Sequence, residues 1–149
     1  MNEQLKALYQ SVILKHDKSP FHYGKREGAI HIIKAYNAFC GDRFDIYFDI
    51  KNGVITDISF HGFGCAISKA STSVLVKKIE NLPLEKVKTT IELFLKNVTP
   101  GENGMTTSDD EITAFSAAKD FPGRQKCATL AWDEMKIFLT ANDELNKQL

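Results

Sequence analysis

The sequence predicts an α+β fold with one N-terminal helix, a three-stranded antiparallel sheet, and then helices packed on one face of that sheet. Apolar and polar residues alternate on both sides of Asn52-Gly53, which is typical of two antiparallel strands joined by a tight turn. Before and after this stretch, apolar residues recur at three- and four-residue spacing, as in amphipathic helices. We expect residues 1–149 to form a single domain with an insertion around residues 101–118.

The first part of the chain is expected to form one helix and one strand. Residues 3–17 carry apolar side chains at helical spacing, and Ser19-Pro20 ends the pattern. The apolar face holds Leu5, Leu8, Tyr9, Val12, Ile13 and His16. The β-branched run from His31 to Tyr36 is typical of a strand.

The clearest strand pattern flanks the turn at residues 52–53. The apolar residues before it are Phe44, Ile46, Phe48 and Ile50, with Asp45, Tyr47 and Asp49 between them. This alternation predicts one buried and one mostly solvated face. After the turn, the alternation is expected to continue through Val54, Thr56, Ile58 and Phe60.

Beyond the sheet the spacing changes to that of helices. Four are expected: one beginning just after Cys65, one over residues 84–98, a short one opened by the acidic run 109–111, and a last one from about Gln125. The stretch 101–108, with two glycines and no strong apolar period, is expected to be a loop and the best candidate for mobility.

Composition excludes several classes of protein. Nineteen basic and nineteen acidic side chains cancel, which argues against a nucleic-acid binder held by a broad positive surface. No apolar run approaches the ~20 residues of a membrane span, and the N-terminus lacks the regions of a signal peptide. We therefore expect a cytoplasmic protein that binds neither nucleic acid nor a membrane. In the cytoplasm, three cysteines are more typical of thiols, metal ligands or redox groups than of structural disulfides.

Cys40, Cys65 and Cys127 are the only cysteines of the chain, and each lies where a loop is expected to give way to regular structure. A soft divalent metal such as zinc prefers deprotonated thiolates in a tetrahedral arrangement. We hypothesise that the three sulfurs converge with Asp42 on one metal that also guards a reactive sulfur. Their spacing matches no compact zinc finger, so separate buried cysteines that act as small apolar residues remain the alternative.

The neighbours of these cysteines are expected to favour the thiolate form. Cys65 precedes a predicted helix, whose dipole stabilises a negative sulfur. Arg124 and Lys126 are expected to do the same for Cys127. Asp42 is a harder ligand than a thiolate, so on zinc it is expected to be displaced most readily.

Three short motifs contain the cysteines in order. They are Cys40-Gly41-Asp42; Gly62-Phe63-Gly64-Cys65-Ala66-Ile67-Ser68 followed by Ala70-Ser71; and Arg124-Gln125-Lys126-Cys127-Ala128-Thr129-Leu130-Ala131-Trp132. In these motifs, and from about Leu5 to Phe138, the chain resembles the U-type iron–sulfur cluster assembly proteins of the IscU/NifU N-terminal family. More narrowly, it resembles the zinc-bearing SufU branch of that family.

Two features distinguish this branch from cluster scaffolds of the IscU type. Such scaffolds carry a histidine immediately before the third cysteine, whereas this chain has Lys126. The chain also holds the insertion at 101–118 that is typical of SufU-like members. It departs from the branch at Ala38-Phe39, where relatives often have Pro-Thr, and at Lys69, a position that is usually apolar. Each departure could alter the fit of a partner.

The resemblance implies a zinc ion held by Cys40, Asp42, Cys65 and Cys127. It also implies that Cys40 accepts sulfur from the persulfide of a SufS-type, pyridoxal-phosphate cysteine desulfurase. In the SufU system a histidine of the desulfurase takes over one zinc position and frees the acceptor thiolate. Arg124 would help to dock this partner. The chain would then be a sulfurtransferase-type relay and desulfurase activator that serves other iron–sulfur assembly proteins, rather than an independent enzyme.

Two alternatives stay open at this point. The same ligands could bind iron and assemble a [2Fe–2S] cluster, which would make the chain a scaffold. Alternatively, zinc could be purely structural, and its removal should then unfold the chain, because structural zinc contributes ~10–16 kcal/mol to the folding of small modules. We expect the fold to survive without metal, since a domain of this size can bury a sufficient core.

Overall fold

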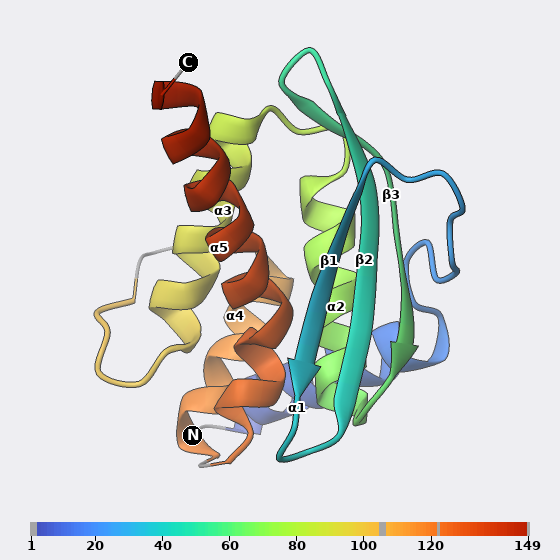
Figure 1. Cartoon of the computed structure of the whole chain (residues 1–149). Helices are drawn as coiled ribbons and strands as arrows, with labels where there is room; N and C mark the ends of the chain where they lie inside the picture. The colour runs from blue at the N-terminus through green and yellow to red at the C-terminus, as the bar shows by residue number, and fades with distance from the viewer. Residues whose placement is uncertain (1–2, 105–106, 122, 149) are drawn as a thin grey trace.

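The computed structural model describes residues 3–104, 107–121 and 123–148, with side chains described as far as residue 143. Its elements are α1 (Glu3–Lys18), β1 (His31–Asn37), β2 (Asp42–Lys51), β3 (Val54–Phe63), α2 (Ala66–Ile79), α3 (Leu84–Val98), α4 (Asp110–Phe115), the 3₁₀ helix η1 (Ser116–Asp120) and α5 (Gln125–Gln148). The predicted α+β order is confirmed (Figure 1). Part of the predicted 101–108 loop lies outside the described residues. Within those residues, no helix has the length and apolar character needed to cross a membrane.

The three strands form one antiparallel sheet with β2 at its centre. Asn52 and Gly53 join β2 to β3 with φ angles of 52° and 74°. Positive φ at both central residues is what a tight hairpin turn of this kind requires, and Asn-Gly supplies it with little strain. The predicted hairpin is therefore confirmed.

The β2–β3 ladder contains a bulge that the sequence pattern did not indicate. Tyr47 pairs with Ser59 and Asp49 pairs with Thr56, so β3 holds one extra residue over this interval. Asp57 lies within the interval and has a φ of 53°. An extra residue of this kind bends the strand and shifts its side-chain phase by one.

Because of the bulge, the residues that face the core in the first half of β3 differ from those predicted. Ile55, Ile58 and Phe60 are buried, whereas Val54 and Thr56 are only partly buried. The prediction that Val54 and Thr56 face the core was wrong. An inserted residue reverses which positions of a strand face the core, and the alternation of apolar residues in the sequence does not reveal the insertion. The prediction was correct for Ile58 and Phe60, which follow the bulge.

The outer face of β2 is also less solvated than predicted. Tyr47 and Asp49 are each 8% exposed. The segment between α1 and β1 covers Asp49, since the Ile30 N–H donates to its carboxylate at 2.8 Å and Arg26 pairs with it at 2.6 Å. The hydrogen bond from Ile30, supported by Arg26, holds the pKa of Asp49 below its ordinary value.

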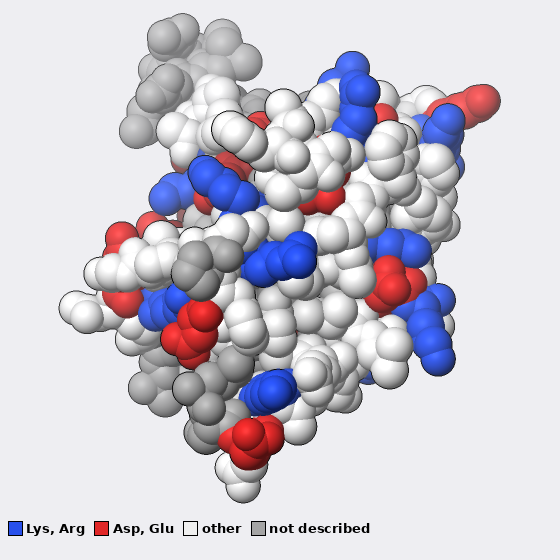
Figure 2. All heavy atoms as spheres, turned by 90° about the horizontal axis from the view of Figure 1, so that it is seen from below, with Lys and Arg blue, Asp and Glu red and all other residues white. Residues whose placement is uncertain are grey.

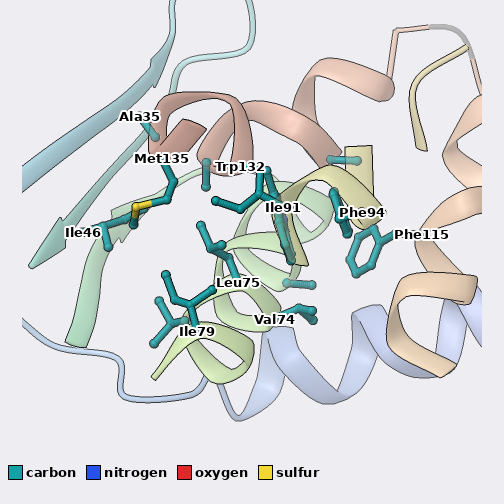
Figure 3. Close-up of a cluster of buried hydrophobic side chains, with 14 of the residues drawn as sticks. Ala35, Ile46, Val74, Leu75, Ile79, Ile91, Phe94, Phe115, Trp132 and Met135 are labelled. Carbon is teal, nitrogen blue, oxygen red and sulfur yellow. The ribbon is translucent and has the colours of Figure 1, made fainter. Parts of the chain in front are cut away.

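The main core lies between the sheet and the helices that cover one of its faces. Figure 3 shows Ala35 and Ile46 of the sheet, Leu75 and Ile79 of α2 and Met135 of α5 gathered around one apolar volume. All five are buried. The close packing of these elements sets the position of their ends, where the cysteines lie.

A stacked aromatic pair fixes the start of α5 against α3, and a serine fixes it against α2. Trp132 lies flat on Phe94, with ring centroids 3.7 Å apart and an interplanar angle of 3°. The Trp132 indole N–H donates to Ser71 Oγ at 3.0 Å, and the Ser71 hydroxyl donates to the carbonyl of Ala128. Cys127 immediately precedes this anchored carbonyl, so its position relative to α2 is constrained.

A buried polar network joins α1, α2 and α4. His16, 3% exposed, hydrogen-bonds Ser73 through Nδ1 at 2.7 Å and Glu111 through Nε2. Lys78 pairs with Glu111 at 3.0 Å and with Asp109 at 2.7 Å. Burial alone would lower the pKa of Lys78, but its hydrogen bonds to Asp109 and Glu111 outweigh burial and raise that pKa. The network therefore holds α4 against the rest of the fold.

Glu111→Gln is expected to reduce the free energy of unfolding of the metal-free protein by about 1–3 kcal/mol at neutral pH. The hydrogen bond from His16, against the effect of burial, holds the pKa of Glu111 far below its ordinary value, and Lys77 and Lys78 act in the same direction. A depressed pKa contributes stability above the unfolded-state pKa of about 4.3, and that stability is lost as the pH falls further. The difference between wild type and variant should therefore shrink below about pH 4.3.

Urea unfolding between pH 3 and pH 7 measures this difference. Glu92→Gln, at an exposed position of α3, is the control and should leave stability nearly unchanged. Equal stability of wild-type and Glu111→Gln proteins at pH 7 would show that the network contributes nothing to folding.

Candidate metal centre

The three cysteines lie at one end of the molecule, at the bottom of Figure 1, where the β1–β2 connection and the first residues of α2 and α5 meet. Cys40 belongs to the connection, Cys65 immediately precedes α2, and Cys127 lies in the first turn of α5. All three are free thiols, with Cys40 exposed, Cys65 partly buried and Cys127 buried. The fold thus brings together sulfurs that are up to 87 residues apart in sequence.

The loop that carries Cys40 is held by its own backbone. The N–H of Gly41 donates to the carbonyl of Asn37 at 2.9 Å, and Gly41 adopts a φ of 71°, which glycine accepts without a steric penalty. Phe39, directly before Cys40, is fully exposed at 102%. The loop therefore presents Cys40 to solvent beside an exposed aromatic ring.

Asp42 is completely buried, with an exposed fraction of 0%. Its Oδ1 accepts a hydrogen bond from the backbone N–H of Cys65 at 2.9 Å, while Oδ2 has no hydrogen-bond partner. A Cβ on Gly64 would lie 2.5 Å from Asp42 Oδ1 and 2.9 Å from a ring carbon of Phe44. Only glycine at position 64 leaves room for this carboxylate, whose second oxygen is an acceptor in need of a partner.

Cys65 is the N-cap of α2. Its Sγ accepts a hydrogen bond from the backbone N–H of Ser68 at 3.4 Å. This is the position at which the partial positive charge of a helix N-terminus favours a negative side chain. The predicted placement of Cys65 at a helix start is therefore confirmed.

The donor atoms of Cys40, Asp42 and Cys127 all lie within 4.8 Å of one another. The Cys40 and Cys127 sulfurs are 3.9 Å apart, and two thiolates on one tetrahedral zinc, each about 2.3 Å from the metal, would be about 3.8 Å apart. Cys65 does not belong to this compact group, but its thiol adjoins that of Cys127. The donor set and the unpartnered buried oxygen of Asp42 fit a zinc ion.

The electrostatics of Cys127 differ from the sequence-based expectation. Burial, supported by the neighbouring Cys65, Asp42 and Cys40, raises the pKa of the Cys127 thiol far above its ordinary value. Arg124 and Lys126 were expected to favour the thiolate, but both residues are exposed whereas Cys127 is only 1% exposed. Burial therefore favours the protonated thiol at Cys127, whereas a bound cation would favour its thiolate.

The surface around the cysteines is largely uncharged. Figure 2, which views this end from below, shows that atoms outside Lys, Arg, Asp and Glu make up most of the face, with basic and acidic groups scattered among them. Phe39 and Phe63, the neighbours of Cys40 and Gly64, are 102% and 67% exposed. Lys69 points elsewhere, since its ammonium lies 5.2 Å above the ring of Tyr23 and 3.9 Å from Asp17.

The model of the protein family described as "NifU-like N terminal domain" matches residues 8–128 of this chain. The chain belongs to this family. It is 34% identical over 131 residues to the iron–sulfur cluster assembly scaffold protein IscU of Thermotoga maritima. This match covers 88% of this chain and 92% of that protein. It is 30% identical over 135 residues to the zinc-dependent sulfurtransferase SufU of Bacillus subtilis. That match covers 91% of each of the two chains.

Solved structures of family members share the fold. A protein of Fervidobacterium islandicum described as an iron–sulfur cluster assembly scaffold for the SUF system superposes with a TM-score of 0.79 at 29% identity, over 88% of this chain and 96% of that one. A NifU-like N-terminal protein of Brucella abortus gives a TM-score of 0.78 at 19% identity, over 92% and 95% of the two chains, and supports the fold alone.

Sequence reasoning missed three residues of this end of the molecule. Gly64 leaves the space that the Asp42 carboxylate occupies, which its place in the motif did not indicate. Tyr9 and Ser68 are buried, at 6% and 1% exposure, and the hydroxyl of each lacks a hydrogen-bond partner. No pattern in the sequence distinguished Ser68 or Tyr9 from the residues around them.

Proposed function

We propose that the chain is a zinc-dependent sulfur acceptor of iron–sulfur cluster assembly that takes sulfur from a SufS-type cysteine desulfurase onto Cys40. One observation carries the proposal: an exposed thiol, Cys40, lies 3.9 Å from a buried thiol, Cys127, beside a buried carboxylate with an unpartnered oxygen. The SufU relative from Bacillus subtilis, a zinc-dependent sulfurtransferase, supports the assignment.

Cys40, Asp42, Cys65 and Cys127 would hold the zinc, which stabilises the thiolate form of its cysteine ligands at neutral pH. Cys127 and Asp42 are inner ligands because both are buried. Cys65, which adjoins the Cys127 thiol, completes the set. Three thiolates and one carboxylate satisfy the four positions that zinc prefers.

The transfer is a thiol–persulfide exchange at Cys40. The Cys40 thiolate attacks the outer sulfur of the desulfurase persulfide, so that a new S–S bond forms on Cys40. The S–S bond of the donor breaks, and the desulfurase cysteine leaves as a thiolate. The electron count balances without an external oxidant or reductant. A downstream iron–sulfur assembly protein would then take the sulfur from Cys40.

The structure favours Cys40 over Asp42 as the ligand that leaves the metal. Asp42 is completely buried, is held by the Cys65 N–H and packs against Gly64. Cys40 lies on an exposed loop. The sequence-based hypothesis that Asp42 yields first rests on ligand hardness alone, and the burial of this carboxylate argues against it.

Exposed groups around Cys40 suit a protein partner. Phe39, which directly precedes Cys40, and Phe63, two residues before Cys65, are exposed, and aromatic side chains are frequent anchors of protein interfaces. Arg124 is exposed just before α5 and adds a positive charge near the same end. These residues would seat the desulfurase with its persulfide close to Cys40.

The test uses freshly purified protein, assayed for metal content and for stimulation of a SufS-type desulfurase. We expect about one zinc per chain and faster release of alanine from cysteine when the chain is added. A chain that holds zinc and yet leaves desulfurase turnover unchanged would refute the acceptor role.

A cluster scaffold is the second candidate, because the Thermotoga maritima relative is a scaffold protein named IscU. Anaerobic reconstitution with iron and sulfide, followed by visible absorption, separates the two. The acceptor proposal predicts no stable cluster, since Lys126 stands where scaffolds of this type carry histidine. A stable cluster that transfers to an apo-protein would favour the scaffold.

A further inference from the structure

Two of the three thiols are in direct contact. The Cys127 S–H donates a hydrogen bond to Cys40 Sγ, with the two sulfurs 3.9 Å apart. Cys40 lies on the exposed connection between β1 and β2, whereas Cys127 is 1% exposed in the first turn of α5. Because the fold holds the two groups together, a reaction between them is intramolecular and does not wait for an encounter in solution.

The direction of this contact matters once Cys40 carries a persulfide. Cys40 Sγ is then the inner sulfur of the persulfide, and the transferred atom is the outer one. A thiol that attacks the outer sulfur moves the persulfide to itself, whereas a thiol that attacks the inner sulfur expels the outer one as sulfide. The Cys127 S–H points at Cys40 Sγ, so it faces the sulfur whose attack releases sulfide.

We propose that Cys127 is a resolving thiol that attacks the Cys40 persulfide when no metal holds it and releases the transferred sulfur as sulfide. The inference rests on the proposed function, in which Cys40 accepts sulfur. A bond forms between the Cys127 and Cys40 sulfurs, and the bond from Cys40 Sγ to the outer sulfur breaks. The proton of Cys127 leaves with the outgoing sulfur as HS⁻. The persulfide is reduced and Cys127 is oxidised, so no external oxidant or reductant is consumed.

The metal would then decide in which form the sulfur leaves the chain. Coordination lowers the pKa of a thiol, and the nucleophilicity of a thiolate falls with its pKa, so zinc would withhold Cys127 from this reaction. The zinc-loaded chain keeps sulfane sulfur on Cys40 for a downstream protein. The metal-free chain releases sulfide and closes a Cys40–Cys127 disulfide, which removes two of the proposed zinc ligands until it is reduced.

The test compares the zinc-loaded and the metal-free chain under anaerobic conditions. Each is treated with inorganic polysulfide, which needs no desulfurase, and the excess is removed by rapid gel filtration. Free sulfide is then measured over time, and the cysteines are mapped by mass spectrometry. We expect about one sulfide and one Cys40–Cys127 disulfide per metal-free chain, on the scale of minutes to hours that uncatalysed disulfide rearrangements take. The zinc-loaded chain should keep the persulfide on Cys40.

Two serine variants of the metal-free chain identify the resolving thiol. Cys127→Ser should release sulfide at least about 10-fold more slowly than wild type, because it lacks the attacking sulfur. Cys65→Ser is the matched control and should release sulfide like wild type. It keeps an oxygen that can accept from the Ser68 N–H, and Cys65 lies outside the compact group of Cys40, Asp42 and Cys127. Cys127→Ala replaces Cys127→Ser if the buried hydroxyl prevents folding.

Three results would overturn the inference: a persulfide that persists on Cys40 of the metal-free wild type, a persulfide that moves to Cys127, or a disulfide that joins Cys40 to Cys65. Equal sulfide release from the zinc-loaded and the metal-free chain would refute the protective role of zinc. None of these results depends on a desulfurase. The proposed function fails separately, if the chain binds no zinc or leaves desulfurase turnover unchanged.

Discussion

Cys40→Ser protein is expected to lose at least about 100-fold in sulfur acceptance, because a hydroxyl is a far weaker nucleophile than a thiolate toward sulfane sulfur. Desulfurase turnover in its presence should return to the rate of the desulfurase alone. The fold should persist, since Cys40 is exposed and outside the main core. The assay measures alanine release and sulfane sulfur on the chain, at several concentrations of the variant.

Phe39→Ala separates docking from chemistry. Phe39 is fully exposed beside Cys40, so its removal should weaken the contact with the desulfurase and leave the thiol in place. Its stimulation should therefore recover as its concentration is raised, whereas that of Cys40→Ser should not. Arg124→Ala is expected to behave like Phe39→Ala. Undiminished stimulation by Cys40→Ser would eliminate the relay through Cys40.

Gly64→Ala is expected to reduce the free energy of unfolding by about 1–3 kcal/mol and to lower zinc affinity at least about 10-fold. The added methyl would lie 2.5 Å from Asp42 Oδ1 and 2.9 Å from Phe44, and neither side chain has room to retreat because both are completely buried. The carboxylate must then move from the position in which it faces the sulfurs. Urea unfolding and chelator competition measure the two effects.

A double-mutant cycle with Asp42→Ala checks the cause. If the methyl acts by displacing the carboxylate, Gly64→Ala should have little further effect on zinc affinity once Asp42 is gone. Part of the loss of stability should remain, because the contact with Phe44 persists. Independent, additive effects on zinc affinity would show that Gly64 does not act through Asp42.

The order of elements could be predicted because each depends on local chemistry. The turn at Asn52-Gly53 needs two residues that tolerate positive φ, and the sequence places them between two alternating strands. The apolar face of α1 and the N-cap position of Cys65 likewise follow from short-range spacing. Such features are visible within a few residues of the chain.

Features that depend on distant segments could not be predicted. The bulge at Asp57 leaves no local signal and is seen only against the partner strand. Asp49 was expected to face solvent, but residues some twenty positions earlier cover it. The basic residues near Cys127 suggested a lowered thiol pKa, whereas the burial of this cysteine raises it. Burial is a property of the assembled structure, and charge counted along the sequence does not substitute for it.

The candidate site was only partly accessible from the sequence. Its residue types and motif order indicated a metal-binding family, but composition and spacing alone left separate buried cysteines as an alternative. The structure adds the short distance between the Cys40 and Cys127 sulfurs and the burial of Asp42, one of whose carboxylate oxygens has no hydrogen-bond partner. It also distinguishes the exposed Cys40 from the buried Cys127. The proposal that Cys40 accepts sulfur while Cys127 stays on the metal depends on this difference.

The most direct test of the proposal that Cys40 is the sulfur acceptor is to locate the transferred sulfur on the chain. Zinc-loaded protein is incubated anaerobically with a SufS-type desulfurase and cysteine, alkylated, digested and mapped by mass spectrometry. We predict one additional sulfur atom on the peptide that contains Cys40, and none on the peptides of Cys65 and Cys127. Sulfur found on Cys65 or Cys127, with Cys40 unmodified, would contradict the account.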